Sequence, residues 1–211
     1  RDLVRSRGLG DVYKRQEFGY VIKLLGVAKN TEDGIEVKVH PMLIPNNHPL
    51  ANVNDAFNAV FVHGKAMDDA MFMGRGAGQM PTASAVVGDI IDVCRNIVHD
   101  SCGRIGCCCY KNLEVKDITD TKSKFFLRLE VADKQGVLAN IASVLGNSGV
   151  SIAQVVQKSG KDGVAELVII TAEVLEKNFN DAMAVFKGLS AVKNIAGVIR
   201  AVSYTHLTLP T

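Results

Sequence analysis

Residues 74–78, GRGAG, have the composition of a loop that approaches a ligand with its backbone. Their spacing is Gly-x-Gly-x-Gly, and Pro81 and Thr82 follow shortly after. Such a loop before a helix can turn backbone N–H groups toward an anion. The spacing matches neither the dinucleotide pattern Gly-x-Gly-x-x-Gly nor a P-loop, which ends in Gly-Lys-Ser/Thr. A phosphate loop and a strand-to-helix turn that needs a positive φ therefore both stay open.

The cysteines and histidines give no pattern for a metal site or a nucleophilic centre. Zinc sites prefer paired spacings such as Cys-x₂-Cys, and adjacent residues rarely all reach one tetrahedral centre. The clustered cysteines are Cys102, Cys107, Cys108 and Cys109, and the histidines outside the C-terminal end are His40, His48, His63 and His99. We therefore predict no metal ion and assign no catalytic residue.

Length and composition are those of an ordinary globular protein. The chain has 211 residues, of which 47% are hydrophobic and 22% charged, with a net charge of +2. It is long enough for two small domains with separate cores. Its near-neutral charge gives no reason to expect binding to nucleic acid or a membrane surface, and no apolar run approaches the ~20 residues that cross a bilayer. With no signal-peptide pattern, we predict a cytoplasmic protein with reduced thiols.

The two ends of the sequence have the character of foreign peptides. Residues 11–16 read DVYKRQ and residues 202–207 read VSYTHL. One possible coding sequence for DVYKRQ, read on the opposite DNA strand and one frame over, encodes Val-Ser-Tyr-Thr-His and the first base of a leucine codon. Both peptides therefore match a single inverted repeat. They are similar to translated transposase sequencing adapters. We therefore predict that residues 1–16 and 203–211 are non-native and exclude them from the fold.

In the first half of the sequence, hydrophobic periodicity predicts strands followed by one helix. Residues 19–30 and 35–40 read as a hairpin, in which Ile35, Val37 and Val39 alternate with polar residues in a half-buried strand. Residues 41–53 contain three prolines and read as a loop. Two strands follow, at 57–64 and 69–74. A helix over about 82–98 is predicted to be largely buried by its apolar stripe, which comprises Val86, Val87, Ile90, Ile91, Val93, Cys94 and Ile97.

The second half reads as a linker and a self-contained domain. Residues 101–122 carry turn residues and charges without a sustained period. Beyond them the pattern predicts the order β-α-β-β-α-β, the ferredoxin-like arrangement, with two helices on one face of a four-stranded sheet. The expected fold class is α+β, a partial mixed sheet with a helix followed by this ferredoxin-like domain.

Two long segments carry a family resemblance. HPMLIPNNHPLANVNDAFNAVFVHG (residues 40–64) and MFMGRGAGQMPTASAVVGDIIDVCRN (71–96) are similar to the C-terminal part of the catalytic region of homoserine dehydrogenase. TKSKFFLRLEVADKQGVLANIASVLGNSGVSI (121–152) resembles the ACT regulatory domain that follows it in many such enzymes. The resemblance implies a catalytic and dimerisation part at 17–100, a linker at 101–122 and an ACT domain at 123–202.

The resemblance also implies an activity, cofactor and substrate. The family interconverts L-homoserine and L-aspartate 4-semialdehyde with NAD or NADP, in threonine, methionine and isoleucine biosynthesis. The family's Gly-x-Gly-Ala-Gly segment borders the cofactor, which points to Gly76, Ala77 and Gly78 here, whereas Arg75 replaces a proline common in some members. The dinucleotide fingerprint of the family is not found, and no lysine here matches the catalytic one of its Asp-x-x-x-Lys segment. We therefore expect the chain alone to be inactive.

The ACT resemblance implies an amino-acid effector, for which L-threonine, the end product, is the expected ligand. The binding residues would come from the loop after the first strand and from the end of the first helix. They are Asp133, Gln135, Gly136, Asn147, Gly149 and Val150, with Gln135 where the family often has proline. Backbone N–H groups there can hold a carboxylate. The domain could instead only dimerise, because a fold alone does not imply a function.

Two functional hypotheses follow. The first is a piece of a biosynthetic oxidoreductase that forms a homo-oligomer and carries a feedback domain. The alternative is a stand-alone ACT-containing regulatory protein that binds an amino acid. Exposed sheet edges in both halves favour self-association in either case.

Overall fold

The computed structural model describes residues 19–103, 113–158 and 163–202, and the predicted non-native segments 1–16 and 203–211 lie outside them. The chain forms two compact units. Unit 1 joins the residues up to 45 to those from 113 onward, and unit 2 comprises residues 46–112. The predicted domain boundaries do not coincide with these units, because residues 20–45 were expected to belong with the residues that follow them.

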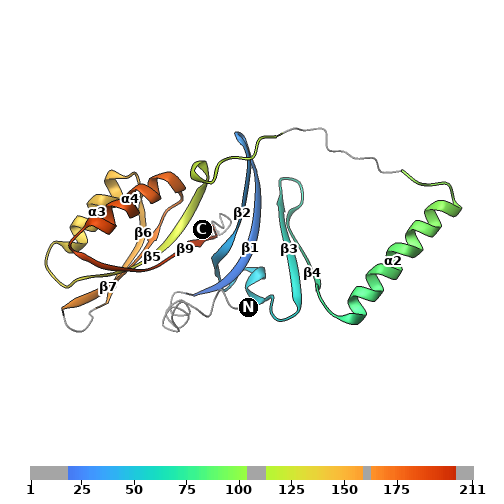
Figure 1. Cartoon of the computed structure of the whole chain (residues 1–211), viewed down its shortest axis with the longest axis horizontal. Coiled ribbons are helices and arrows are strands. Elements are labelled where there is room, and N and C mark those ends of the chain that lie inside the picture. Colours follow the sequence, from blue (N-terminus) through green and yellow to red (C-terminus); the bar gives the residue numbers. More distant parts are fainter. Residues whose placement is uncertain (1–18, 104–112, 159–162, 203–211) are drawn as a thin grey trace, which may run out of the picture. The chain divides into compact units, whose positions relative to one another are not determined.

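Unit 1 contains the predicted β-α-β-β-α-β order. Its strands pair antiparallel in the order β9-β5-β7-β6, and a two-residue strand, β8, pairs with the start of β5. Helices α3 and α4 lie together on one face of this sheet (Figure 1). The elements are β5 (Lys122–Ala132), α3 (Val137–Asn147), β6 (Ile152–Lys158), β7 (Val164–Thr171), β8 (Val174–Leu175), α4 (Glu176–Gly188) and β9 (Val192–Ala201).

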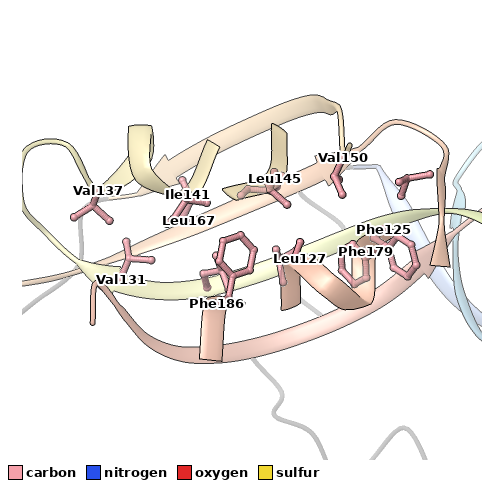
Figure 2. Packing of buried hydrophobic residues seen from close by; sticks show 14 of the residues in the cluster. Phe125, Leu127, Val131, Val137, Ile141, Leu145, Val150, Leu167, Phe179 and Phe186 are labelled. Atoms are coloured by element: carbon pink, nitrogen blue, oxygen red, sulfur yellow. The ribbon is translucent and has the colours of Figure 1, made fainter. Parts of the chain in front are cut away.

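The main core of unit 1 lies between the helices and the sheet. Alternate residues of β5 point toward the helices, and the apolar stripe of α3 faces them (Figure 2). The rings of Phe125 and Phe179 stack with centroids 3.6 Å apart and an interplanar angle of 2°. Fully buried members of this core include Leu127, Leu129, Ile141, Leu145, Leu167, Ile169, Phe179 and Phe186. The predicted periodicity of two in the strands and of 3.6 in the helices is thus realised as burial.

The opposite face of the sheet is covered by a hairpin. Strands β1 (Tyr20–Thr31) and β2 (Gly34–Pro45) pair antiparallel, and β2 continues the sheet beyond β9 through a short parallel ladder. A second core forms here from Leu43, Phe126, Val168, Ile170 and Ala201, with Tyr20, Ile22 and Ile199 packed against it. Strand β7 is buried on both faces and accordingly reads as a nearly continuous apolar run, whereas Arg128 and Glu130 interrupt the apolar residues of β5.

Strand β2 is half-buried as predicted, but its polar side is the buried one. Val37 and Val39 are 53% and 72% exposed, whereas Glu36 and Lys38 are only 6% and 7% exposed. The alternation therefore identifies the strand without identifying its inward face. Charged residues can be buried here because they find partners of opposite charge in unit 1.

The loop predicted from residue 41 begins later than expected. Strand β2 runs to Pro45, and only then does the chain turn into η1, a 3₁₀-helix at Pro49–Asn52. Two prolines fit within the strand because β9 pairs only with Met42 and Leu43, so neither Pro41 nor Pro45 is paired on both sides. Proline is tolerated where one side of the strand needs no N–H donor.

Part of the predicted linker is structured as well. The backbone of Ile35 accepts from the N–H of Lys116 at 2.9 Å and donates to the carbonyl of Glu114 at 2.8 Å. The 3₁₀-helix η2 (Ile118–Asp120) then leads into β5. Residues 113–121 thereby tie the hairpin turn to the first strand of the ferredoxin-like fold.

Unit 2 contains a two-stranded hairpin and one long helix. The two predicted strands are present as β3 (Phe57–Gly64) and β4 (Asp68–Arg75), and they pair antiparallel. Helix α2 (Gln79–Val98) begins three residues before the expected start at Thr82. The prediction that α2 is largely buried is wrong for this chain, since none of its residues is buried. An apolar stripe becomes buried only where another apolar surface faces it. The described part of unit 2 provides no such surface.

Candidate functional site

The glycine loop of unit 2 is a strand-to-helix turn. Gly78 has φ = 132°, which only glycine adopts without strain, and its carbonyl accepts the N–H of Thr82 at 3.1 Å. Gly76 donates its N–H to the carbonyl of Ala56 at 3.1 Å, and a Cβ at this position would overlap the side-chain amide of Asn58. Gly78 is therefore required by its backbone conformation, and Gly76 is required by the space that the side chain of Asn58 occupies.

The same geometry limits how an anion could be bound. The N–H of Gly76 is already engaged, so Ala77, Gly78 and the first turn of α2 provide the remaining backbone donors. Gly78 supplies no side chain that caps the helix. Arg75 lies over the ring of Phe57, 4.9 Å from guanidinium carbon to centroid. The loop thus fits a supporting contact to a cofactor, and not a complete phosphate cradle.

Unit 1 has a cavity at the end of β5. Its volume is about 310 Å³, and the N-terminus of α3 forms part of its wall. The lining residues are Val131, Ala132, Asp133, Lys134, Gln135, Gly136, Val137, Leu138, Gln157 and Leu167. Apolar side chains from strand and helix share this wall with charged and amide groups, an arrangement that suits a small amphiphilic ligand.

The loop from Asp133 to Gly136 is held by its own hydrogen bonds. The N–H of Asp133 donates to Gly163 at 2.9 Å and that of Lys134 to Ala132 at 3.0 Å. Gly136 adopts a left-handed conformation, with φ = 82°, and precedes α3 directly. In the described part of the chain, the N–H groups of Gln135 and Gly136 have no backbone acceptor. These two groups, at the positive end of a helix, are the natural place for a carboxylate.

The other predicted effector residues lie at the opposite end of α3. Eleven residues at ~1.5 Å rise separate the helix ends by about 16 Å. Gly149, with φ = 71°, and Val150 close this end, and the N–H of Val150 donates to Leu145 at 2.8 Å. Val150 is 2% exposed and belongs to the core. Within this chain, Asp133, Gln135 and Gly136 therefore share the cavity, whereas Asn147, Gly149 and Val150 do not.

Sequence analysis missed several residues of the two candidate sites. Gln157 is a polar residue on β6 that lines the cavity, and Asn58 of β3 lies directly beneath Gly76. The sequence did not single out Gln157, because β6 also carries Gln154 and Lys158. Asn58 carried no signal, because its contact with Gly76 depends on the β3–β4 register, which pairs it with Gly74.

The described residues also contain no group of three or more His, Cys, Asp or Glu placed to hold a metal ion. Cys94 and Cys102 are exposed. Cys107, Cys108 and Cys109, which the sequence analysis considered as ligands, lie outside the described residues. In the parts of the chain that are described, no helix is long and apolar enough to cross a membrane.

Comparison with known proteins accounts for both units. Residues 4–91 match the model of the homoserine dehydrogenase family, and residues 119–200 match that of the ACT domain. The homoserine dehydrogenase of Pseudomonas aeruginosa is 39% identical over 189 residues, which are 86% of this chain and 44% of the relative. That of Corynebacterium glutamicum is 39% identical over 196 residues, 90% of this chain and 43% of the relative.

The chain is a homologue of the homoserine dehydrogenases. A solved homoserine dehydrogenase from Thiobacillus denitrificans agrees, with 38% identity and a TM-score of 0.82 over 92% of this chain and 45% of that one. The expected resemblance and the α+β fold with a ferredoxin-like ACT domain are thereby confirmed. The chain spans less than half the length of the relatives that it matches. The match to the homoserine dehydrogenase family begins at residue 4, within the segment expected to be foreign.

The two family segments and the two compact units divide the chain differently. Strands β1 and β2 fall within the homoserine dehydrogenase match, yet they pack in unit 1 against the ACT domain. Unit 1 therefore combines a hairpin of one family segment with the whole of the other.

Proposed function

We propose that this chain is part of a homoserine dehydrogenase that interconverts L-homoserine and L-aspartate 4-semialdehyde. The main support is the continuous similarity to relatives of that name, at 39% identity over 86–90% of the chain. Hydride would pass between the substrate and NAD or NADP. We further propose a cytoplasmic, homo-oligomeric enzyme of threonine, methionine and isoleucine biosynthesis.

Within such an enzyme, the glycine loop would stand beside the cofactor. The backbone N–H groups of Ala77 and Gly78, at the start of α2, would face the cofactor. The side chain of Asn58, which contacts Gly76, would hold the loop in place. No residue of this chain is proposed to transfer the proton. NAD or NADP supplies the hydride acceptor when it is bound, and the residues of this loop only orient it.

A chimera tests the catalytic proposal. Residues 17–202 would be joined to the portion of the Pseudomonas aeruginosa relative that this chain does not span. We expect L-homoserine-dependent reduction of NAD or NADP by the chimera and none by the present chain. Gly78→Val in the chimera should lower kcat/KM at least tenfold, whereas Gly74→Val, where nothing lies within 4 Å of an added Cβ, should not. Turnover by the present chain alone would contradict the proposal.

For the ACT domain we propose an amino-acid effector, L-threonine, bound at the cavity of Asp133, Gln135 and Gly136. The backbone N–H groups of Gln135 and Gly136 would bind the carboxylate of the amino acid, and the carboxylate of Asp133 would attract its ammonium group. Asn147, Gly149 and Val150 would take part only if a second copy brought that end of α3 to the cavity.

Titration calorimetry with the whole chain tests this site. L-Threonine should release or absorb heat, and Asp133→Asn should weaken binding at least tenfold because it removes the charge opposite the ammonium group. Asp181→Asn, at an exposed position of α4, is the matched control and should leave the affinity unchanged. No heat at millimolar L-threonine would contradict the effector proposal. The stand-alone regulatory alternative predicts the same binding, so only the chimera separates it from the enzyme.

A further inference from the structure

A buried polar cluster joins the hairpin β1–β2 to the ACT domain. Lys38 of β2 donates from Nζ to the carbonyl of Lys122 at 2.9 Å and to the hydroxyl of Ser123 at 3.0 Å. Ser123 donates in turn to the carboxylate of Glu176 at 2.8 Å. We call Lys38, Ser123, Glu176 and Arg200 the Lys38 joint. It connects β2 with β5, with the start of α4 and with β9.

Glu176 is the centre of this joint. Its carboxylate accepts from Nε and Nη2 of Arg200 at 2.6 and 2.7 Å, and its side chain is only 2% exposed. Burial alone would raise the pKa of Glu176, but hydrogen bonds from Arg200 and Ser123 and the charges of Arg200 and Lys38 outweigh it and lower that pKa. The carboxylate is therefore ionised and fully engaged, so it needs no further ligand.

The charges of the cluster balance. The carboxylate of Glu36 lies 3.7 Å from Nζ of Lys38. Together with the carboxylate of Glu176, it neutralises the two cations, Lys38 and Arg200. Lys116, 3.9 Å from Glu36, follows at the more exposed rim. Removing one member leaves a buried charge without compensation, which is more costly than the intact pair is stabilising.

The backbone holds the hairpin at two places, the hydrogen bonds of Ile35 with Glu114 and Lys116 and a short ladder to β9. The ladder between β2 and β9 contains only two residue pairs, Met42 with Arg200 and Leu43 with Ala201. A slip of two residues along β2 would keep the same faces inward, because side chains alternate with a period of two. Such a slip would put Pro41 or Pro45, which are also apolar, in the place of Leu43, so the second core distinguishes the registers only through the shape of that residue.

The Lys38 joint does discriminate. A two-residue slip moves each side chain by about 6.6 Å, beyond hydrogen-bonding distance of Lys122 and Ser123. In one direction it would bring Glu36 toward the carboxylate of Glu176, and in the other it would bring His40 into the place of Lys38. Both alternatives remove Lys38 from Glu176 and leave Arg200 as its cationic partner.

We propose that the Lys38 joint fixes hairpin β1–β2 to the ACT domain in one register, so that the hairpin and the ACT domain move as one body. The residue on the hairpin side belongs to the homoserine dehydrogenase match, and its three partners belong to the ACT match. The joint thus carries any displacement of β5 or α4 to the hairpin. This inference concerns the chain itself and holds whether or not the effector proposal is correct.

Hydrogen exchange of the whole chain, with Lys38→Met, tests the joint. Methionine keeps the length of the side chain and removes its donors. We expect amides of β1 and β2 to exchange at least about tenfold faster than in the parent chain, while amides of α3 and β7 change less than twofold. The matched control is Lys29→Met. Lys29 lies on the same hairpin, and its Nζ is 3.8 Å from the carboxylate of Glu173, but its side chain is 45% exposed. This substitution should change hairpin exchange less than twofold.

Two outcomes would overturn the proposal. In the first, Lys38→Met and Lys29→Met have the same small effect on the hairpin. In the second, protection falls equally throughout unit 1, which would make Lys38 a general contributor to stability. If Lys38→Met does not fold, Ser123→Ala serves instead, because it removes the bridging hydroxyl without changing the charge. Ser123→Ala should accelerate amide exchange in the hairpin about threefold without affecting that of β7. An equal acceleration in the hairpin and in β7 would again refute the joint.

Discussion

Helices α2 and α3 carry similar apolar stripes, but the stripe of α3 is buried and that of α2 is exposed. In α3, Val137, Ile141 and Leu145 are buried between the helix and the sheet (Figure 2). In α2, Ile90 and Ile97 are 56% and 65% exposed, and no residue of the helix is buried. The difference teaches that periodicity predicts a helix and its apolar side, whereas burial depends on the surface that faces it. Unit 1 contains that surface within the chain, and the described part of unit 2 does not.

The largest effect that tests this comparison is expected from Phe179→Ala. Phe179 is 2% exposed and stacks on Phe125, so its truncation should cost about 3–5 kcal/mol of the free energy of unfolding. Ile90→Ala, on the exposed side of α2, should cost less than about 1 kcal/mol. Urea denaturation, read by hydrogen exchange of peptides from each unit, measures both. Equal losses would show that α2 is packed in solution.

A smaller contrast is expected between charged pairs. Glu176→Gln weakens the buried bonds to Arg200 and should cost about 2–4 kcal/mol in unit 1. Asp69→Asn affects the pair of Asp69 with His63 in unit 2, where the side chains are 35% and 50% exposed, and should cost less than about 1 kcal/mol. The same denaturation experiment reports both values. The contrast fails if Asp69→Asn proves the more damaging substitution.

Acid should weaken unit 1 through His40. Both ring nitrogens of His40 are buried without a partner among the described residues, and burial, with the charge of Arg200, lowers its pKa from 6.5. The unfolded chain therefore takes up the proton first. This contribution to stability is fully present above pH 6.5 and is lost as the pH falls through the folded-state pKa, by at most ~1.4 kcal/mol per pH unit.

His40→Phe should flatten that dependence, as measured by urea denaturation between pH 8 and pH 5. The exposed His63→Phe in unit 2 is its control and should leave the pH dependence of unit 1 unchanged. An unaltered slope in His40→Phe would assign the acid sensitivity to another group.

The smallest expected effect is a gain of stability in α2. Gly88 lies in the middle of this helix, and nothing is within 4 Å of an added Cβ. Gly88→Ala should therefore stabilise the helix by about 0.5–1 kcal/mol, through the difference in helix propensity. Circular dichroism during thermal unfolding checks the sign. A loss of stability would mean that another surface packs against Gly88, and the contrast between the two helices would then need revision.

Sequence reasoning succeeded where local pattern decides the structure. It predicted the first hairpin, the two strands of unit 2, the helices and the β-α-β-β-α-β order, because alternation and helical period are local properties. It gave the wrong burial for α2, and it did not reveal which face of β2 is buried. That face is decided by Glu176 and Arg200, which lie more than 130 residues further along the chain.

The candidate sites show the same division. Gly78, Asp133 and Gly136 were all named through the family resemblance, and whether they bind a ligand stays a prediction. Asn58 and Gln157 could not be assigned, since their roles depend on strand register and on a cavity formed by separate elements. Whether Asn147, Gly149 and Val150 bind a ligand stays a prediction.

The hairpin on the helix-free face of the sheet has a practical and evolutionary consequence. A gene cut at the start of the ACT match would separate Phe126, Val168 and Ile170 from Tyr20, Ile22 and Leu43, which cover them. The excised domain would expose an apolar sheet face, a feature that promotes aggregation. Recombination that transplants an ACT domain of this type should therefore carry the hairpin with it, or replace those three sheet residues with polar ones.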